Sequence, residues 1–309
     1  MSTVVVPEFL GERFLELLAG QHEVIYDPDL YADRPGLLAA VADARAILIR
    51  NRTLVDTELL GAAPNLAIIG RLGVGLDNID MAGCAAARVV VRPALGANAI
   101  SVAEYVLTAM LSLLRPVFGM TGAMVAGEWP RQGHAFGNEA SGKTLGLLGF
   151  GSIARQVARR AAAFDMVVIA HDPFVPANDP AWGNAESVTF EDLLRRADVL
   201  SVHTPLTPET RHLVGADALT LMKPTALLIN TSRGGTVDEE ALVLALRNGD
   251  IAGAAIDVFA SEPLPPGPAS RFAGLTNLLL TPHLAGNTQE SVDRVAAVTV
   301  ATVLEFLKS

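Results

Sequence analysis

Three ionisable side chains, one basic, one acidic and one imidazole, each follow a short apolar stretch in the second half of the sequence. They are Arg233, Glu262 and His283. Each apolar stretch has the length and composition of a strand buried on both faces of a parallel sheet. Because the carboxyl ends of parallel strands meet at one edge, where open α/β sheets bind ligands, we expect the three side chains to face one cleft.

The combination suits the reduction of a carbonyl group by hydride. An imidazole has a pKa near neutral pH, so His283 can give and take the hydroxyl proton. A neighbouring carboxylate such as Glu262 would orient the ring and raise its pKa. The planar guanidinium of Arg233 can hold a carboxylate through two parallel bonds, a geometry that Lys lacks. Each residue taken alone could be an ordinary surface residue, but their joint placement favours catalysis.

A glycine-rich turn indicates where a hydride carrier would bind. The turn Gly149-Phe-Gly151-Ser-Ile-Ala154 has the form G-x-G-x-x-[G/A] and lies between a predicted strand and a predicted helix. Asp172 follows the next strand, about 20 residues past the turn, where a carboxylate accepts hydrogen bonds from ribose hydroxyls. Because that carboxylate would repel a 2′-phosphate, the sequence predicts NAD rather than NADP. We interpret His203, which follows a further strand, as lining the same site.

The elements that must position these residues are predicted along the whole chain. Apolar runs alternate with segments of helical spacing, which favours an α/β protein with doubly wound parallel sheets. The rhythm breaks near residue 98, where the capping-box pattern Ser101–Glu104 precedes a helical run to about Arg115, and a closing helix is expected from Asn287 on. The predicted strands are 3–6, 23–26, 46–49, 66–69, 89–91, 145–148, 167–170, 199–202, 226–229, 254–258 and 278–280.

The composition excludes several classes of protein. The 309-residue chain carries 23 Lys and Arg against 33 Asp and Glu, a net charge of −10, which argues against nucleic acid or an anionic membrane as the main partner. The most apolar stretch, 102–120, contains Glu104, Arg115 and Pro116, so it is not a membrane span. The N-terminus does not resemble a signal peptide, and the single cysteine, Cys84, indicates a reducing compartment, the cytoplasm. No His, Cys, Asp or Glu spacing is zinc-like, so we expect no metal.

Seven motifs spread over nearly the whole chain have the form of one family. They are Arg71-Leu-Gly-Val-Gly-Leu-Asp-Asn78, Gly96-Ala-Asn-Ala-Ile-Ser-Val-Ala-Glu104, Gly142-Lys-Thr-Leu-Gly-Leu-Leu-Gly-Phe-Gly151, His203-Thr-Pro-Leu-Thr207, Asn230-Thr-Ser-Arg-Gly-Gly235, Asp257-Val-Phe-Ala-Ser-Glu-Pro263 and Pro282-His-Leu-Ala-Gly286. With these, the sequence resembles the D-isomer-specific 2-hydroxyacid dehydrogenases of the phosphoglycerate dehydrogenase type. The resemblance implies a Rossmann NAD-binding domain, residues 99–284, inserted in a flavodoxin-like substrate domain, residues 1–98 and 285–309. It also implies closure of the two domains over the substrate and a homodimer formed through the NAD-binding domain.

The resemblance further implies roles for the site residues. Arg233 would hold the substrate carboxylate and carbonyl, Glu262 would support His283, and His283 would be the acid and base. The implied cofactor-binding residues, together with those named above, are Gly149, Gly151, Ser152, Ile153, Asp172, His203, Thr204, Pro205, Thr231, Ser232, Asp257 and Gly286. The backbone N–H groups implied to hold the substrate carboxylate belong to Leu72, Gly73, Val74 and Gly75, with Asn98 near the hinge between the domains.

Two arginines narrow the set of candidate substrates. Arg50 and Arg52 follow strand 46–49, where a parallel sheet would turn them toward the cleft. One of them could meet a second anionic group, a phosphate, carboxylate or sulfonate, although both could equally be solvated surface residues. The start Pro7-Glu-Phe9 and the Arg50–Thr53 loop also resemble the sulfolactate dehydrogenase branch. The candidate substrates are therefore hydroxypyruvate or glyoxylate, 3-phosphoglycerate, and sulfolactate.

Two other functions fit the same fold. One is a non-enzymatic NAD-sensing interaction protein, and the other is a dehydrogenase of a different small anion such as formate or phosphite. The presence of all three catalytic residue types favours an enzyme over an NAD-sensing protein. A substrate without a second acid group, such as formate, would give Arg50 and Arg52 no role. Because the sequence ends at Ser309, we expect no C-terminal regulatory domain of the kind found in some serine-pathway relatives, and no feedback control by serine.

Overall fold

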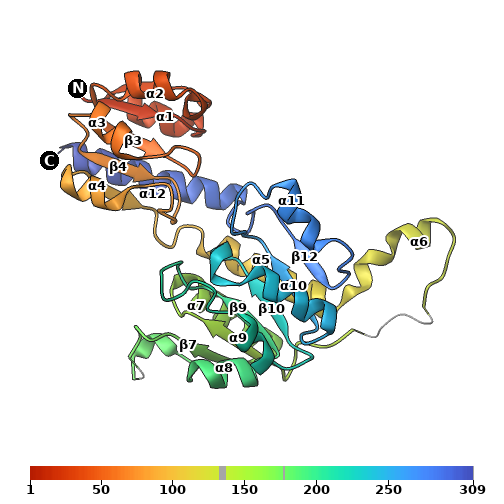
Figure 1. Ribbon diagram of the computed structural model, residues 1–309. Helices are drawn as coiled ribbons and strands as arrows, with labels where there is room; N and C mark the ends of the chain where they lie inside the picture. Colours follow the sequence, from red (N-terminus) through yellow and green to blue (C-terminus); the bar gives the residue numbers. More distant parts are fainter. Residues whose placement is uncertain (132–136, 177, 309) are drawn as a thin grey trace. The chain divides into compact units, whose positions relative to one another are not determined.

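The chain folds into two units, and the sequence of unit 2 is inserted between the two segments of unit 1. The computed structural model describes residues 1–131, 137–176 and 178–308 (Figure 1). Unit 1 consists of Met1–Asn98 and Asn287–Ser309, and unit 2 consists of Ala99–Gly286. Each unit has its own parallel sheet covered by helices, which confirms the predicted α/β class with two doubly wound sheets.

Unit 1 is built on five parallel strands in the order β2-β1-β3-β4-β5, the flavodoxin-like arrangement. The strands are β1 (Thr3–Val6), β2 (Glu23–Tyr26), β3 (Ala44–Ile49), β4 (Ile68–Arg71) and β5 (Val90–Pro93). Its helices are α1 (Glu12–Ala19), α2 (Arg34–Ala40), α3 (Thr57–Ala62), α4 (Met81–Ala86) and α12 (Gln289–Lys308). Successive strand residues point to opposite faces. Val4 and Val6 pack in the apolar cluster of α1 and α12, whereas Val5 packs in that of α2, α3 and α4, so both faces are buried.

Unit 2 is built on seven parallel strands in the order β12-β11-β10-β9-β6-β7-β8, which places β6 at the point where the strand order reverses. The strands are β6 (Thr144–Leu148), β7 (Val167–His171), β8 (Glu186–Ser187), β9 (Val199–Val202), β10 (Leu227–Asn230), β11 (Gly253–Ile256) and β12 (Leu278–Leu280). The helices are α5 (Ala99–Leu114), α6 (Thr121–Val125), α7 (Ser152–Ala161), α8 (Phe190–Arg196), α9 (Ala216–Leu221), α10 (Glu239–Asn248) and α11 (Pro266–Ala269). This is the Rossmann arrangement with one additional strand at the edge.

The eleven predicted strands all form, with ends that differ by at most two residues from the predicted ones. The strand β8 was not predicted, because it is two exposed residues long and carries no apolar signal. The capping-box prediction at Ser101 is wrong: α5 begins at Ala99, so Ser101 lies in its first turn, where the side chain is buried. Glu104, the other residue of the predicted box, pairs instead with Arg160 of α7, with 3.4 Å between Glu104 Oε1 and Arg160 Nη2.

Among the described residues, no helix combines the length and the hydropathy that a membrane span requires.

Candidate active site

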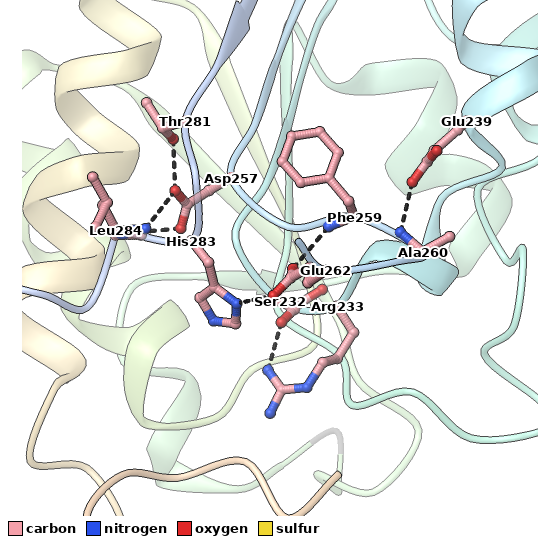
Figure 2. Close-up of polar contacts among 11 residues, drawn as sticks. Ser232, Arg233, Glu239, Asp257, Phe259, Ala260, Glu262, Thr281, His283 and Leu284 are labelled. Carbon is pink, nitrogen blue, oxygen red and sulfur yellow. Dashed lines mark hydrogen bonds and ion pairs between the residues drawn. The ribbon is translucent and has the colours of Figure 1, made fainter. Parts of the chain in front are cut away.

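The three predicted catalytic side chains come together at the carboxyl edge of unit 2. Arg233 follows β10, Glu262 lies in the loop after β11, and His283 follows β12. These strands are neighbours in the sheet, so their ends share one edge. Figure 2 shows the Glu262 carboxylate facing the His283 ring, with the Arg233 side chain beside them. His283 Nδ1 lies 2.6 Å from Glu262 Oε2.

This pairing tunes both titratable groups. The hydrogen bond to Glu262 raises the pKa of His283 above its ordinary value of 6.5 and outweighs the opposing effect of burial. Burial by itself would raise the pKa of Glu262, but hydrogen bonds from His283 and from the Phe259 N–H, at 2.9 Å, bring it below its ordinary value. Glu262 is therefore an anion near neutral pH, and it stabilises the imidazolium form of His283.

A second carboxylate, Asp257, holds the loop that carries His283. It is fully buried, and its oxygens accept the Thr281 hydroxyl at 2.6 Å and the N–H groups of Leu284 and Ala285 at 2.8 Å each (Figure 2). Its carbonyl accepts the His283 N–H at 2.8 Å. His283 has a φ of 56°, a left-handed conformation that a non-glycine residue keeps only where its surroundings impose it. The bonds to Asp257 supply that restraint.

The loop that carries Arg233 is held in a similar way by a buried amide. Asn230 donates from Nδ2 to the Arg233 carbonyl at 2.9 Å and accepts the Ser232 N–H and hydroxyl at 3.0 and 2.8 Å. The next residue, Gly234, passes so close to the following loop that a Cβ there would lie 1.9 Å from the Phe259 carbonyl carbon. A glycine is required at this crossing, and it fixes the Arg233 loop against the Glu262 loop.

The glycine-rich turn after β6 fits the pyrophosphate of a dinucleotide. Gly149 has a φ of +89°, and a Cβ there would lie 3.0 Å from the His203 carbonyl group, whereas a Cβ on Gly151 would meet nothing within 4 Å. The helix α7 starts directly after Gly151 without a side-chain cap. Within the described chain, the N–H groups of Ser152 and Ile153 have no acceptor, so they are available to an anion.

Within the described part of the chain, the neighbouring strand ends carry polar atoms that lack partners. Thr204, after β9, and Thr231, after β10, each bury a hydroxyl that finds no hydrogen-bond partner among the described residues. Buried polar groups are nearly always paired, so two unpaired hydroxyls at adjacent strand ends fit a polar ligand such as a nicotinamide dinucleotide. Burial lowers the pKa of His203 to about 4, so this ring is neutral, and its Nε2 lies 2.9 Å from the Ser201 hydroxyl.

Asp172 stands where a ribose-binding acid is expected, and it also braces the turn. One oxygen accepts the Phe150 N–H at 2.8 Å, and the other accepts the Phe174 N–H at 2.9 Å. The remaining cofactor residues predicted by resemblance lie beside these strand ends, with Pro205 directly after Thr204 and Gly286 at the last position of unit 2.

Unit 1 presents main-chain groups at the end of β4. The Leu72 N–H donates to the Ile49 carbonyl at 2.8 Å, and the Gly73 N–H donates to the Arg71 carbonyl at 2.7 Å. Of the four predicted substrate-binding N–H groups, only those of Val74 and Gly75 have no acceptor within the part of the chain that the structure describes.

The end of the first segment of unit 1 offers a further polar atom. Asn98, the last residue of this segment, buries a side-chain oxygen without a partner among the described residues. This oxygen is available to accept a hydrogen bond, which is compatible with the substrate-binding position expected for Asn98.

The two arginines after β3 differ in their surroundings. Arg52 donates to the Tyr31 hydroxyl at 2.5 Å, and its guanidinium carbon lies 5.0 Å from the centre of the Tyr31 ring. Arg50 lines a cavity of about 310 Å³ between α1 and the start of α12. Its guanidinium pairs with no other group among the residues that the structure describes. Arg50 is therefore the better placed of the two to receive an anion.

The loop of these arginines depends on a residue that sequence reasoning missed. Glu8 is 3 % exposed, and its carboxylate accepts the N–H groups of Arg50, Arg52 and Thr53 at 2.8, 3.2 and 3.1 Å and the Thr53 hydroxyl at 2.8 Å. The only sequence signal for this role is an acid directly after an apolar strand. As for metals, no group of three His, Cys, Asp or Glu side chains among the described residues is arranged to hold an ion.

Comparisons with known proteins identify the family. Residues 107–285 match the model described as D-isomer specific 2-hydroxyacid dehydrogenase, NAD binding domain. The (S)-sulfolactate dehydrogenase of Chromohalobacter salexigens is 49% identical over 308 residues, which is 99% of each chain. The D-3-phosphoglycerate dehydrogenase of Mycobacterium tuberculosis is 41% identical over 294 residues, 95% of this chain but only 54% of the relative, so this chain spans about half of that protein.

Solved structures agree with this assignment. A crystal structure of a protein from Thermus thermophilus has a TM-score of 0.89 at 34% identity and covers 99% of this chain and 97% of its own. The NADPH-dependent glyoxylate/hydroxypyruvate reductase of Sinorhizobium meliloti has a TM-score of 0.87 at 30% identity and covers 100% of this chain and 96% of its own. The resemblance predicted from the motifs is confirmed. The chain therefore belongs to the D-isomer-specific 2-hydroxyacid dehydrogenases, oxidoreductases that use a nicotinamide cofactor.

Proposed function

We propose that the protein interconverts a small 2-hydroxy acid and its 2-keto acid, with His283 as the acid and base. The observation that carries this proposal is the 2.6 Å pair between His283 and Glu262 beside Arg233. These three side chains supply the acid, the base and the carboxylate-binding group that the chemistry of the family requires.

The proton moves at one defined atom. Because Nδ1 of His283 is bonded to Glu262, Nε2 is the ring nitrogen left to meet the substrate. During reduction, Nε2 gives its proton to the carbonyl oxygen, and during oxidation the neutral ring takes the hydroxyl proton. Arg233 holds the substrate carboxylate and polarises the carbonyl. The nicotinamide, when bound, supplies or accepts the hydride.

We propose unit 2 as the NAD-binding domain and unit 1 as the substrate domain, with functional boundaries at residues 98 and 285. Two observations support the first assignment. Among the described residues, the N–H groups of Ser152 and Ile153 have no acceptor, and the hydroxyls of Thr204 and Thr231 have no partner. The Asp172 carboxylate supports NAD as the preferred cofactor, because a 2′-phosphate would place a second negative charge beside it.

The substrate that we propose carries a second anionic group. The sulfolactate dehydrogenase relative, 49% identical over nearly the whole chain, supports a sulfonate. Arg50 supplies a cation without a competing partner within the described chain. The Tyr31 contacts of Arg52 make it the weaker candidate.

The test is NADH oxidation with sulfopyruvate, 3-phosphohydroxypyruvate, hydroxypyruvate and glyoxylate. We expect the highest kcat/KM for a dianionic acid. The Arg50→Ala variant should lose about tenfold of that kcat/KM while retaining activity on glyoxylate, with Arg52→Ala as the matched variant. Equal kcat/KM values for mono- and dianionic acids would contradict the dianion proposal. NADH binding without turnover of any acid would favour an NAD-sensing protein.

We also propose a cytoplasmic homodimer. Exposed apolar side chains gather around α6, which Figure 1 draws extending from the rest of unit 2, and they include Val125 at 84 % and Trp129 at 75 % exposure. An exposed apolar segment of this kind fits a partner surface, and a second copy is the partner that the family resemblance implies. Light scattering after size exclusion should give twice the monomer mass of 32.4 kDa.

A further inference from the structure

One buried arginine determines which backbone groups the loop after β4 presents. Arg71 is 8 % exposed and folds back on its own loop, where Nε donates to the Gly75 carbonyl at 2.8 Å and Nη1 donates to the Leu72 carbonyl at 2.9 Å. The intervening Gly73 carbonyl accepts the Ala94 N–H at 2.9 Å. These three carbonyl oxygens are thus occupied within unit 1.

The Val74 and Gly75 N–H groups, which have no acceptor among the described residues, lie between the carbonyls that Arg71 binds. In a trans peptide the N–H points away from the C=O of the same plane. The Gly73 carbonyl is directed at Ala94, so the Val74 N–H points the opposite way. Arg71 fixes the peptides on both sides of the Val74 and Gly75 N–H groups, and these donors are free among the described residues. A loop of this kind attracts an anion, because its donors are exposed while its carbonyls are turned away.

The fit between the arginine and the loop is close. Gly73 has a φ of +155°, and a Cβ at this position would lie 2.5 Å from Arg71 Nη1. Any side chain larger than the hydrogen of glycine at position 73 would displace the Arg71 guanidinium. The position of the Arg71 side chain therefore depends on Gly73.

We propose that Arg71 is a positioning residue that makes the 72–75 loop a receptor for the carboxylate shared by all substrates, with Val74 and Gly75 as its donors. This rests on the proposed function in assuming a 2-keto acid substrate. Arg71 acts through the backbone, so its role differs from that of Arg50. Its effect extends to monoanionic and dianionic acids alike.

The test compares Arg71→Met, Arg71→Lys and Gly73→Ala. Arg71→Met should raise KM for glyoxylate and for a dianionic acid by the same factor, about 10–100-fold, with kcat within about threefold and NADH affinity unchanged. Gly73→Ala should raise KM in the same way although Arg71 is chemically intact. Arg71→Lys should recover part of the affinity, because it keeps the charge but can bond only one carbonyl well. The matched control is Arg45→Met. Arg45 is exposed and lies near the start of β3, whereas Arg71 is the last residue of β4.

A second measurement separates this proposal from the proposed function. Calorimetry of oxamate, a non-reacting 2-keto acid analogue, binding to the NADH-loaded protein needs no turnover. Oxamate affinity reduced about tenfold or more in folded Arg71→Met or Gly73→Ala supports the positioning role. Unchanged oxamate affinity and KM in either folded variant, or a loss confined to kcat, would overturn it. Absence of turnover in the wild type would refute the proposed function alone.

Discussion

The two units differ in which parts of the chain supply their functional groups. In unit 2 the groups that we place at the reacting atoms are side chains, and buried polar partners such as Asp257 and Asn230 hold the loops that carry them. In unit 1 the relation is reversed, because the buried side chains of Glu8 and Arg71 hold backbone segments. The segment held by Arg71 presents N–H groups, and the segment held by Glu8 carries Arg50 and Arg52. We infer that unit 2 determines the rate of the chemistry, and that unit 1 contributes to the affinity for the acid and, through Arg50, to the choice between acids.

The largest effect that separates the units should come from His283. His283→Ala should lower kcat by about 10²–10⁴-fold, because it removes the acid and base, while NADH affinity stays unchanged. Stopped-flow NADH oxidation and NADH titration measure the two quantities. The control is His212→Ala, which removes an exposed histidine of unit 2 that also has a positive φ, 52°. A kcat within about threefold of the wild type would show that another group moves the proton.

An intermediate effect should appear as a pH dependence. Reduction needs protonated His283, whose pKa is raised by the Glu262 hydrogen bond, so kcat/KM for reduction should be constant at low pH and fall as pH rises through a midpoint above 6.5. Oxidation should show the opposite trend. Glu262→Gln removes the largest cause of the shift, so the midpoint should move to lower pH, and kcat for reduction at about pH 7.5 should fall about tenfold.

The control for this profile is Glu191→Gln, an exposed acid on α8 that pairs with Arg195. It should leave the midpoint unchanged. A Glu262→Gln profile that coincides with the wild-type profile would mean that the observed midpoint belongs to another group.

The smallest effect should come from Glu8 and should fall on substrate choice. The Glu8 Oε1 accepts the Arg50 and Thr53 N–H groups, and Oε2 accepts the Arg52 N–H. Glu8→Gln leaves only one acceptor oxygen for these bonds, at a cost of about 1–3 kcal/mol in the stability of unit 1. KM for a dianionic acid should rise about 3–10-fold, while KM for glyoxylate and kcat stay constant. Equal rises for both acids would place the loop outside the recognition of the second anionic group.

The sequence predicted the fold and the side-chain part of the site better than the backbone part. Strands buried on both faces have a strong apolar signal, so all eleven predicted strands were recovered, and the strand-end rule brought Arg233, Glu262 and His283 to one edge. The start of α5 was misplaced because the capping pattern at Ser101 is local, whereas the residue is buried by packing.

The roles of Glu8 and Arg71 could not be predicted, because the sequence does not show whether a charged side chain at a strand end contacts a ligand or its own backbone. Glu8 acts on a loop more than 40 residues away, which no local pattern records. Arg71 acts on the residues directly after it, but only because Gly73 turns the chain back across its guanidinium. Roles that consist of shaping backbone depend on the path of the chain, and this path is visible only in three dimensions.

Asp172 has a consequence for how the cofactor preference of this chain can evolve or be engineered. The oxygen expected to meet the ribose belongs to the same carboxylate that accepts the Phe150 N–H inside the glycine-rich turn. A replacement without an acceptor atom would thus also release the turn that receives every dinucleotide. The Sinorhizobium meliloti enzyme of the same fold is NADPH-dependent, so the fold itself permits the exchange. In this chain the exchange therefore has two requirements, which are to remove the negative charge and to keep an acceptor for the Phe150 N–H.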